Sequence, residues 1–185
     1  PRPMLKRTPF YDFHVHAGGK MVDFAGWELP SMYRGIVAEH QQTRNSGSIF
    51  DISHMGRLYF SGKEAQKLLE LVLTRRTSDQ LVGQSRYSLI CNEAGGILDD
   101  VIVSRDIKNW LVVCNASNRQ KVMRHFTKVR SEKDLDCDIS DQTEATAMLA
   151  LQGPKVIERM AGILPVDLRE MKRYRVEWTS FMLIK

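Results

Sequence analysis

The spacing of apolar residues between positions 56 and 151 predicts strands combined with two helices. Apolar and polar residues alternate in several short runs, as they do in strands with one buried face. In other runs the apolar residues recur at intervals of three and four, as on the buried side of a helix. The predicted strands are 57–61, 86–92, 97–103, 110–115 and 145–153, and the predicted helices are 63–74 and 118–130.

The order of these elements is close to β-α-β-β-α-β, the ferredoxin-like arrangement, with one more strand in the middle. The pattern also allows a further strand near 136–140. Outside this unit the predicted elements are helices at 9–17, 32–45 and 155–162 and a strand that begins near Tyr174. We therefore expect an α+β fold in which the flanking segments belong together and the ferredoxin-like unit is inserted between them.

The composition is that of an ordinary globular chain. Of the 185 residues, 43% are hydrophobic and 26% are charged, and no apolar run approaches the roughly 18 residues that a membrane span needs. The three cysteines, Cys91, Cys114 and Cys137, form no CxxC pair. This spacing argues against a disulfide framework or a zinc site and favours a reducing compartment. The net charge of +5 favours an anionic partner, such as nucleic acid, a phosphorylated or polycarboxylate ligand, or an acidic protein.

Two aspartates lie side by side in the apolar run "NEAGGILDDVIV", residues 92–103. Successive side chains of a strand point to opposite faces, so Asp99 and Asp100 cannot form one carboxylate pair. Both faces of this strand are largely apolar, and a carboxylate among apolar neighbours needs a partner or a ligand. The alternative is that the pair is a solvated strand edge that hinders aggregation.

The hairpin that precedes the aspartates decides which of them shares a face with Tyr87. An even-length turn centred on Gly95 and Gly96 places Tyr87, together with Leu89 and Cys91, on the face of Asp100. An odd-length or bulged turn pairs these residues with Asp99 instead. Residue patterns alone leave both alternatives open.

Other polar motifs give weaker indications. A metal site at His14 and His16 is disfavoured because no cysteine is close and no carboxylate is singled out as a third ligand. The stretch "FDISHMG", residues 50–56, is interpreted as a packed junction, with Met55 as an adaptable pocket wall in the alternative interpretation. Phosphate-binding glycine motifs are missing. An RNA-recognition module would need aromatic residues where the central strands have Leu, Ile and Val.

Several stretches form a combination specific enough to compare with a known family. They are "LKRTPFYDFHVHAGGKMVDFAGWELP", "FDISHMG", "YSLICNEAGGILDDVIV", "NAS" and "LALQGP". In this order they resemble the aminomethyltransferase, or T protein, of the glycine cleavage system, over nearly the whole chain. Members of that family are much longer and end in further folate-contacting residues and a C-terminal barrel domain. We therefore expect an N-terminal fragment that lacks the rest of its folate-binding domain.

The resemblance implies a reaction, a co-substrate and a set of site residues. The implied enzyme moves the aminomethyl carbon from the lipoyl arm of the H protein to tetrahydrofolate and releases ammonia. Asp100 matches the catalytic carboxylate that faces the pterin ring of tetrahydrofolate. The residues that match positions lining the folate pocket are Met55, Tyr87, Val113 and Asn115. Asp99 is expected to have a structural or supporting role.

The resemblance also implies a domain plan. Residues 1–55 and 152–185 are expected to belong to a first, folate-binding α/β domain, which is truncated at its C-terminus. Residues 56–151 are expected to form the inserted ferredoxin-like domain. We expect a cytoplasmic or, in a eukaryote, a mitochondrial matrix protein, monomeric, without a metal, a nucleic-acid partner or a membrane partner. The rivals are a non-catalytic folate-binding relative of the same fold and, at a greater distance, the RNA-binding module.

Overall fold

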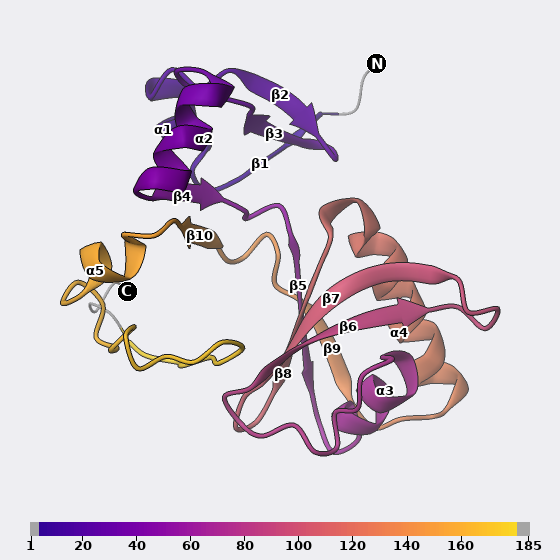
Figure 1. Cartoon of the computed structure of the whole chain (residues 1–185). Helices are drawn as coiled ribbons and strands as arrows, with labels where there is room; N and C mark the ends of the chain where they lie inside the picture. Colours follow the sequence, from indigo (N-terminus) through magenta and orange to yellow (C-terminus); the bar gives the residue numbers. More distant parts are fainter. Residues whose placement is uncertain (1–3, 181–185) are drawn as a thin grey trace. The chain divides into compact units, whose positions relative to one another are not determined.

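The computed structural model describes residues 4–180, which divide into two compact units. Of these residues, unit 1 comprises 4–54, Thr146–Met171 and 178–180, and unit 2 comprises Met55–Ala145 and Lys172–Glu177. Both units contain helices and strands, so the fold is mixed α/β, with three sheets among the described residues (Figure 1).

Unit 2 is built on a five-stranded sheet in the order β6-β7-β8-β5-β9. All neighbouring strands in it run antiparallel. Its strands are β5 (Gly56–Ser61), β6 (Ser85–Cys91), β7 (Ile97–Arg105), β8 (Trp110–Cys114) and β9 (Asp138–Asp141). Its helices are α3 (Ala65–Val72), α4 (Arg119–Glu132) and the short 3₁₀ helix η1 (Ala116–Asn118).

The core of unit 2 lies between one face of this sheet and the helices α3 and α4 (Figure 1). Every second strand residue points to this face, which makes the alternating pattern of the sequence a buried surface. Phe60 on β5 and Phe126 on α4 meet there edge to face, with ring centroids 4.6 Å apart. The residues that form the centre of the core are Leu58, Phe60, Leu68, Leu69, Ile90, Val101, Val103, Val112, Val122 and Phe126.

The strand predicted at 145–153 is present but belongs to another sheet, and the possible strand near 136–140 takes its place in this one. The apolar run at 145–153 forms β10 (Leu149–Gln152), which pairs antiparallel with β4 (Ser48–Asp51) in unit 1. The fifth strand of unit 2 is β9, at the edge of the sheet beside β5. Its sequence, "DISD", has only one apolar residue, because an edge strand buries little side-chain surface. The ferredoxin-like classification of the unit stays a prediction.

Unit 1 contains two small sheets, in the orders β1-β3-β2 and β10-β4. Their remaining strands are β1 (Lys6–Arg7), β2 (Met21–Phe24) and β3 (Trp27–Pro30). The helices are α1 (Tyr11–His16), α2 (Ile36–Asn45) and α5 (Val156–Met160), which confirms the three predicted flanking helices with narrower bounds.

The predicted C-terminal strand is wrong over the residues that the structure describes. Tyr174 and Val176 belong to unit 2, where the segment makes a single bridge between Gln84 and Arg175. The alternating side chains therefore mark a segment that packs beside a sheet without joining it. The rest of this prediction, at 181–185, lies outside the described residues.

A buried polar network joins α1 to the end of β4 in unit 1. Asp51 accepts hydrogen bonds from the Thr8 hydroxyl at 2.6 Å and the Ser53 backbone at 2.9 Å. It also bonds His14 Nε2 at 2.9 Å, while His14 Nδ1 lies 2.7 Å from the Tyr33 hydroxyl. A carboxylate can only accept, so His14 Nε2 carries the hydrogen and donates it to Asp51.

This network predicts an acid-dependent loss of stability. Burial raises the pKa of Asp51, but the hydrogen bonds from His14, Ser53 and Thr8 outweigh burial and hold the pKa below its usual value. A lowered pKa in the folded state stabilises above the ordinary Asp pKa of about 3.9, and this stability is lost as the pH falls through the folded value. We expect Asp51→Asn to flatten the dependence of Tm on pH between about pH 4 and pH 2, as measured by calorimetry. The exposed Asp12 provides the control Asp12→Asn; an equally steep acid limb in both variants would contradict the prediction.

Candidate functional site

The two aspartates of β7 point to opposite faces of the five-stranded sheet. Asp99 is 3% exposed and lies on the side of α3 and α4, with Val101 and Val103. Asp100 is exposed and lies on the opposite face. The strand alternation that separated the two carboxylates in the sequence is therefore confirmed. Asp100 can therefore contact a bound molecule, whereas the buried Asp99 cannot.

The register of the β6–β7 hairpin places Tyr87 on the face of Asp100. Leu89 lies opposite Asp100, and Tyr87 lies opposite Ile102. The loop 92–96 has an odd number of residues, but the register shifts between Ile90 and Cys91, so that Leu98 is an extra residue on β7. The odd-length loop and the extra residue each shift the pairing by one position, and the two shifts cancel. Tyr87 and Leu89 therefore lie on the same face as Asp100, as they would after an even-length turn. Cys91, beyond the bulge, pairs with Ile97 instead.

A row of side chains crosses the face of Asp100 from strand to strand. Tyr87 on β6 is opposite Ile102 on β7, Ile102 is opposite Val113 on β8, and Val113 is opposite Arg57 on β5. Residues directly opposite each other in antiparallel strands have their side chains on the same face. Two of the predicted pocket residues, Tyr87 and Val113, therefore share the face of Asp100.

Asn115, directly after β8, is hydrogen-bonded to both aspartates. Its side-chain Nδ2 donates to Asp99 Oδ1 and to Asp100 Oδ1, each at 2.9 Å, and lies 3.2 Å from the Asp100 carbonyl oxygen. Its backbone N–H donates to Asp99 Oδ2 at 2.9 Å. The structure thus brings the predicted Asn115 and Asp100 into direct contact.

Tyr87 is electrostatically coupled to Asp100. Desolvation, followed by the charge of Asp100 and a hydrogen bond to its carboxylate, raises the pKa of the Tyr87 phenol above its usual value; the charge of Asp99 adds to the shift. The phenol therefore keeps its proton at neutral pH and can donate it in a hydrogen bond. Tyr87 is 49% exposed, so a flat molecule bound at Asp100 could lie against its ring.

Met55 is held beside this face through its backbone. The guanidinium of the buried Arg57 donates through Nη1 to the Met55 carbonyl at 2.8 Å and through Nη2 to the Thr143 carbonyl. These bonds fix the chain where it enters β5. Among the described residues, the hydrogen bonds that Asn115 donates to Asp99 and Asp100 do not involve the Met55 side chain.

Two residues at this place were not predicted from the sequence. Arg57 lies on the face of Asp100 next to Val113, and Asn118 donates to the buried Asp99 Oδ1 at 2.6 Å. Arg57 could have been noticed in the sequence, because it is the charged residue of the alternating run "GRLYFS". No sequence feature pointed to Asn118, since its partner, Asp99, lies on a strand 19 residues away in the sequence.

The remaining candidate groups have structural partners. His16 Nδ1 contacts the Asp12 carbonyl at 2.6 Å, and the His54 ring packs edge to face on Phe24 at 5.3 Å between centroids. Burial, with the charge of Asp99, raises the pKa of Cys114 to about 12, which keeps it an unreactive thiol at neutral pH. Within residues 4–180 no cluster of three His, Cys, Asp or Glu side chains could hold a metal, and no helix is both long and apolar enough to cross a membrane.

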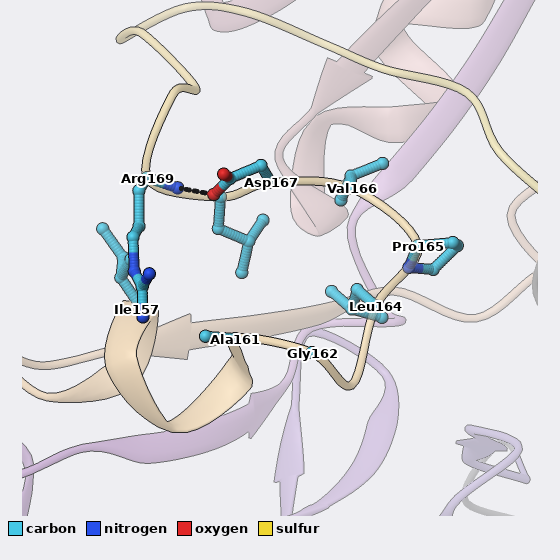
Figure 2. Close-up of a pocket in the computed structure, with 9 residues that line it drawn as sticks. Ile157, Ala161, Gly162, Leu164, Pro165, Val166, Asp167 and Arg169 are labelled. Carbon is cyan, nitrogen blue, oxygen red and sulfur yellow. Dashed lines mark hydrogen bonds between the residues drawn. The ribbon is translucent and has the colours of Figure 1, made fainter.

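A pocket of about 310 Å³ lies elsewhere, in unit 1 (Figure 2). It runs from α5 along the following loop, where the Arg169 backbone donates to Asp167 at 3.0 Å. Its lining residues are Ile157, Ala161, Gly162, Leu164, Pro165, Val166, Asp167, Leu168 and Arg169. None of the predicted site residues contributes to it, and its one acidic side chain is tied to its own loop. The open face around Asp100 is the stronger candidate.

Comparison with known proteins gives a consistent result. The family model described as the GCVT N-terminal domain matches residues 10–185. A protein named aminomethyltransferase from Rubrobacter xylanophilus is 46% identical over 174 residues, which are 94% of this chain and 46% of that protein. An aminomethyltransferase of Thermus thermophilus is 38% identical over 170 residues, or 91% of this chain and 48% of that protein.

A solved structure agrees with these relatives. The glycine cleavage system aminomethyltransferase T from Bartonella henselae superposes with a TM-score of 0.85 at 35% identity. The match covers 92% of this chain and 46% of that one. The chain therefore spans about half the length of the relatives and of the solved structure that it matches.

Proposed function

The chain belongs to the family of the GCVT N-terminal domain, and on that premise we propose that it is part of a tetrahydrofolate-dependent aminomethyltransferase of glycine cleavage. The whole enzyme would take the aminomethyl carbon from the lipoylated H protein, pass it to tetrahydrofolate and release ammonia. This membership confirms the resemblance found in the sequence. The substrates and the H protein belong to the proposal.

One observation carries the proposal: Asp100 is an exposed carboxylate held in place by Asn115, beside the half-exposed ring of Tyr87. This set fits a pterin ring. A carboxylate can accept two parallel N–H donors from a flat heterocycle, which gives both strength and geometric selectivity. The Tyr87 ring offers an aromatic face to the same heterocycle.

Five residues would hold tetrahydrofolate on this face: Met55, Tyr87, Asp100, Val113 and Asn115. When bound, tetrahydrofolate supplies the nitrogen that receives the one-carbon unit. Asp100 would accept hydrogen bonds from the pterin and place a negative charge beside the reacting carbon. A fixed carboxylate stabilises positive charge that develops in a transition state better than water does, because it need not reorganise. Asp100 could also take a proton as the accepting nitrogen loses one.

The test uses the full-length protein of which this chain is a part. Lipoylated H protein carrying the aminomethyl group is mixed with enzyme and tetrahydrofolate, and released ammonia is measured against time. We expect ammonia release that depends on both partners. Tight folate binding without ammonia release would favour the non-catalytic relative, and salt-dependent RNA binding without folate binding would favour the RNA-binding module.

Tyr87 gives a separate prediction about folate affinity. We expect Tyr87→Ala to raise the KM for tetrahydrofolate about tenfold, because a flat ring stacked on an aromatic side chain loses about 1–3 kcal/mol when that side chain becomes alanine. Tyr87→Phe keeps the ring and loses only the hydroxyl, so its KM is expected within about threefold of wild type. Steady-state kinetics measure both. Equal KM values for the Ala and Phe variants would show that the ring does not contact the folate.

A further inference from the structure

Asp99 is a buried carboxylate whose oxygens are surrounded by N–H donors. It accepts from the Asn115 backbone at 2.9 Å, from Asn115 Nδ2 at 2.9 Å and from Asn118 Nδ2 at 2.6 Å. Such donors are what allows a carboxylate to be buried among apolar residues. Two of the three come from one residue, Asn115, so Asp99 holds both the backbone and the side chain of Asn115.

This double attachment fixes the direction of the Asn115 amide. An asparagine side chain that is free in solution rotates about two bonds, whereas here its Nδ2 is held by the carboxylate that also holds its backbone. Hydrogen bonds to an ionised acceptor are about twice as strong as neutral ones. The amide has two hydrogens. With one on Asp99, the other is directed at Asp100, whose Oδ1 lies 2.9 Å and whose carbonyl oxygen lies 3.2 Å from Nδ2.

We infer that Asp99 is a positioning residue: through Asn115 it sets the direction of the Asp100 carboxylate on the open face of the sheet. The inference rests on the proposed function, in which Asp100 contacts the folate. Asp99 itself touches no substrate, because it lies on the core side of the sheet. Its contribution to the reaction passes through a single side chain.

The test is a double-mutant cycle in the full-length protein. Asp99→Asn places an N–H₂ group or a weaker neutral acceptor against the Asn115 amide, and we expect kcat/KM for aminomethyl transfer to fall about 100-fold, as misplacement of a catalytic group by about 1 Å does. In an Asn115→Ala background the same change is expected to cost less than about threefold, because the connecting side chain is already gone. Additive losses in the double variant would overturn the inference.

A control separates positioning from stability. Asn118→Ala removes one hydrogen bond to Asp99 and none to Asn115, so we expect a lower Tm with a much smaller loss of kcat/KM. If Asn118→Ala lowers kcat/KM as much as Asp99→Asn does, Asp99 acts through stability and the inference is wrong. Should Asp99→Asn fail to fold, Asp99→Ser, which leaves room for water at the lost oxygen, takes its place in the cycle.

An activity-independent readout distinguishes this inference from the proposed function. The side-chain ¹⁵N–¹H signals of Asn115, assigned by their loss in Asn115→Ala, report whether the amide is held. We expect them to move to the positions of a free asparagine in Asp99→Asn. If wild-type enzyme transfers no aminomethyl group, the proposed function is wrong, and unchanged Asn115 signals in Asp99→Asn would show separately that Asp99 does not hold the amide.

Discussion

Asp100→Asn in the full-length enzyme is expected to lower kcat/KM for aminomethyl transfer about 100- to 1000-fold. Asparagine has the same shape as aspartate but carries no charge, so the variant isolates the charge that we assign to catalysis. Removal of one preorganised electrostatic group from an active site has effects of this size. The side chain is exposed, so Tm should change by no more than about 2 °C. Ammonia release with aminomethylated H protein provides the measurement.

The matched control for this variant is Asp138→Asn. Asp138 is an exposed aspartate at the edge of the same sheet, on β9. Loss of one negative charge there should leave kcat/KM near the wild-type value, which shows that net charge alone does not account for the effect. An Asp100→Asn enzyme within about threefold of wild type would remove Asp100 from the mechanism.

Phe60→Ala is expected to have the largest effect on stability. The Phe60 ring is fully buried and packs edge to face on Phe126. Truncation of a buried phenylalanine costs about 3–5 kcal/mol, because transfer energy is lost and a cavity remains. With a urea m-value of about 2 kcal/mol/M, the unfolding midpoint would fall by about 2 M. Urea denaturation followed by circular dichroism measures this shift.

Ile107→Ala serves as the comparison for Phe60→Ala. Ile107 lies in the loop between β7 and β8 and is 80% exposed. Its truncation removes little buried surface, and we expect the free energy of unfolding to change by less than about 0.5 kcal/mol. Equal effects of the two variants would mean that the packed core described for unit 2 is wrong.

The sequence pattern predicted those features of the site that depend on local backbone geometry. Strand alternation alone separated Asp99 from Asp100, because the two-residue period of a strand is a property of the backbone. Hairpin parity narrowed the neighbours of Asp100 to two alternatives. It could not choose between them, because the bulge at Leu98 depends on how β6 and β7 pair. Assignment of the folate role to Asp100 came from resemblance to a family.

Contacts between distant segments were beyond the sequence pattern. The bonds from Asn115 to both aspartates join residues 15 and 16 positions apart, and periodicity contains no information at that range. The prediction that β10 rather than β9 joins the five-stranded sheet failed for the same reason. "LALQ" and "DISD" differ in hydrophobicity, yet the more polar segment joins the larger sheet, because strand partners are chosen by tertiary packing rather than by the propensity of one segment.

The bulge at Leu98 also bears on how this hairpin can vary among homologous sequences. Leu89 pairs with Asp100 on the side of the bulge that is farther from the turn. A deletion of Leu98 would therefore give regular strand pairing and leave Asp100 on the same face of the sheet. The turn of this hairpin can thus gain or lose a residue without moving Asp100 and Tyr87 to the other face of the sheet. Single-residue insertions and deletions are therefore tolerable at this end of the strand pair, whereas one between Asp100 and Ile102 would invert the facing of one of them.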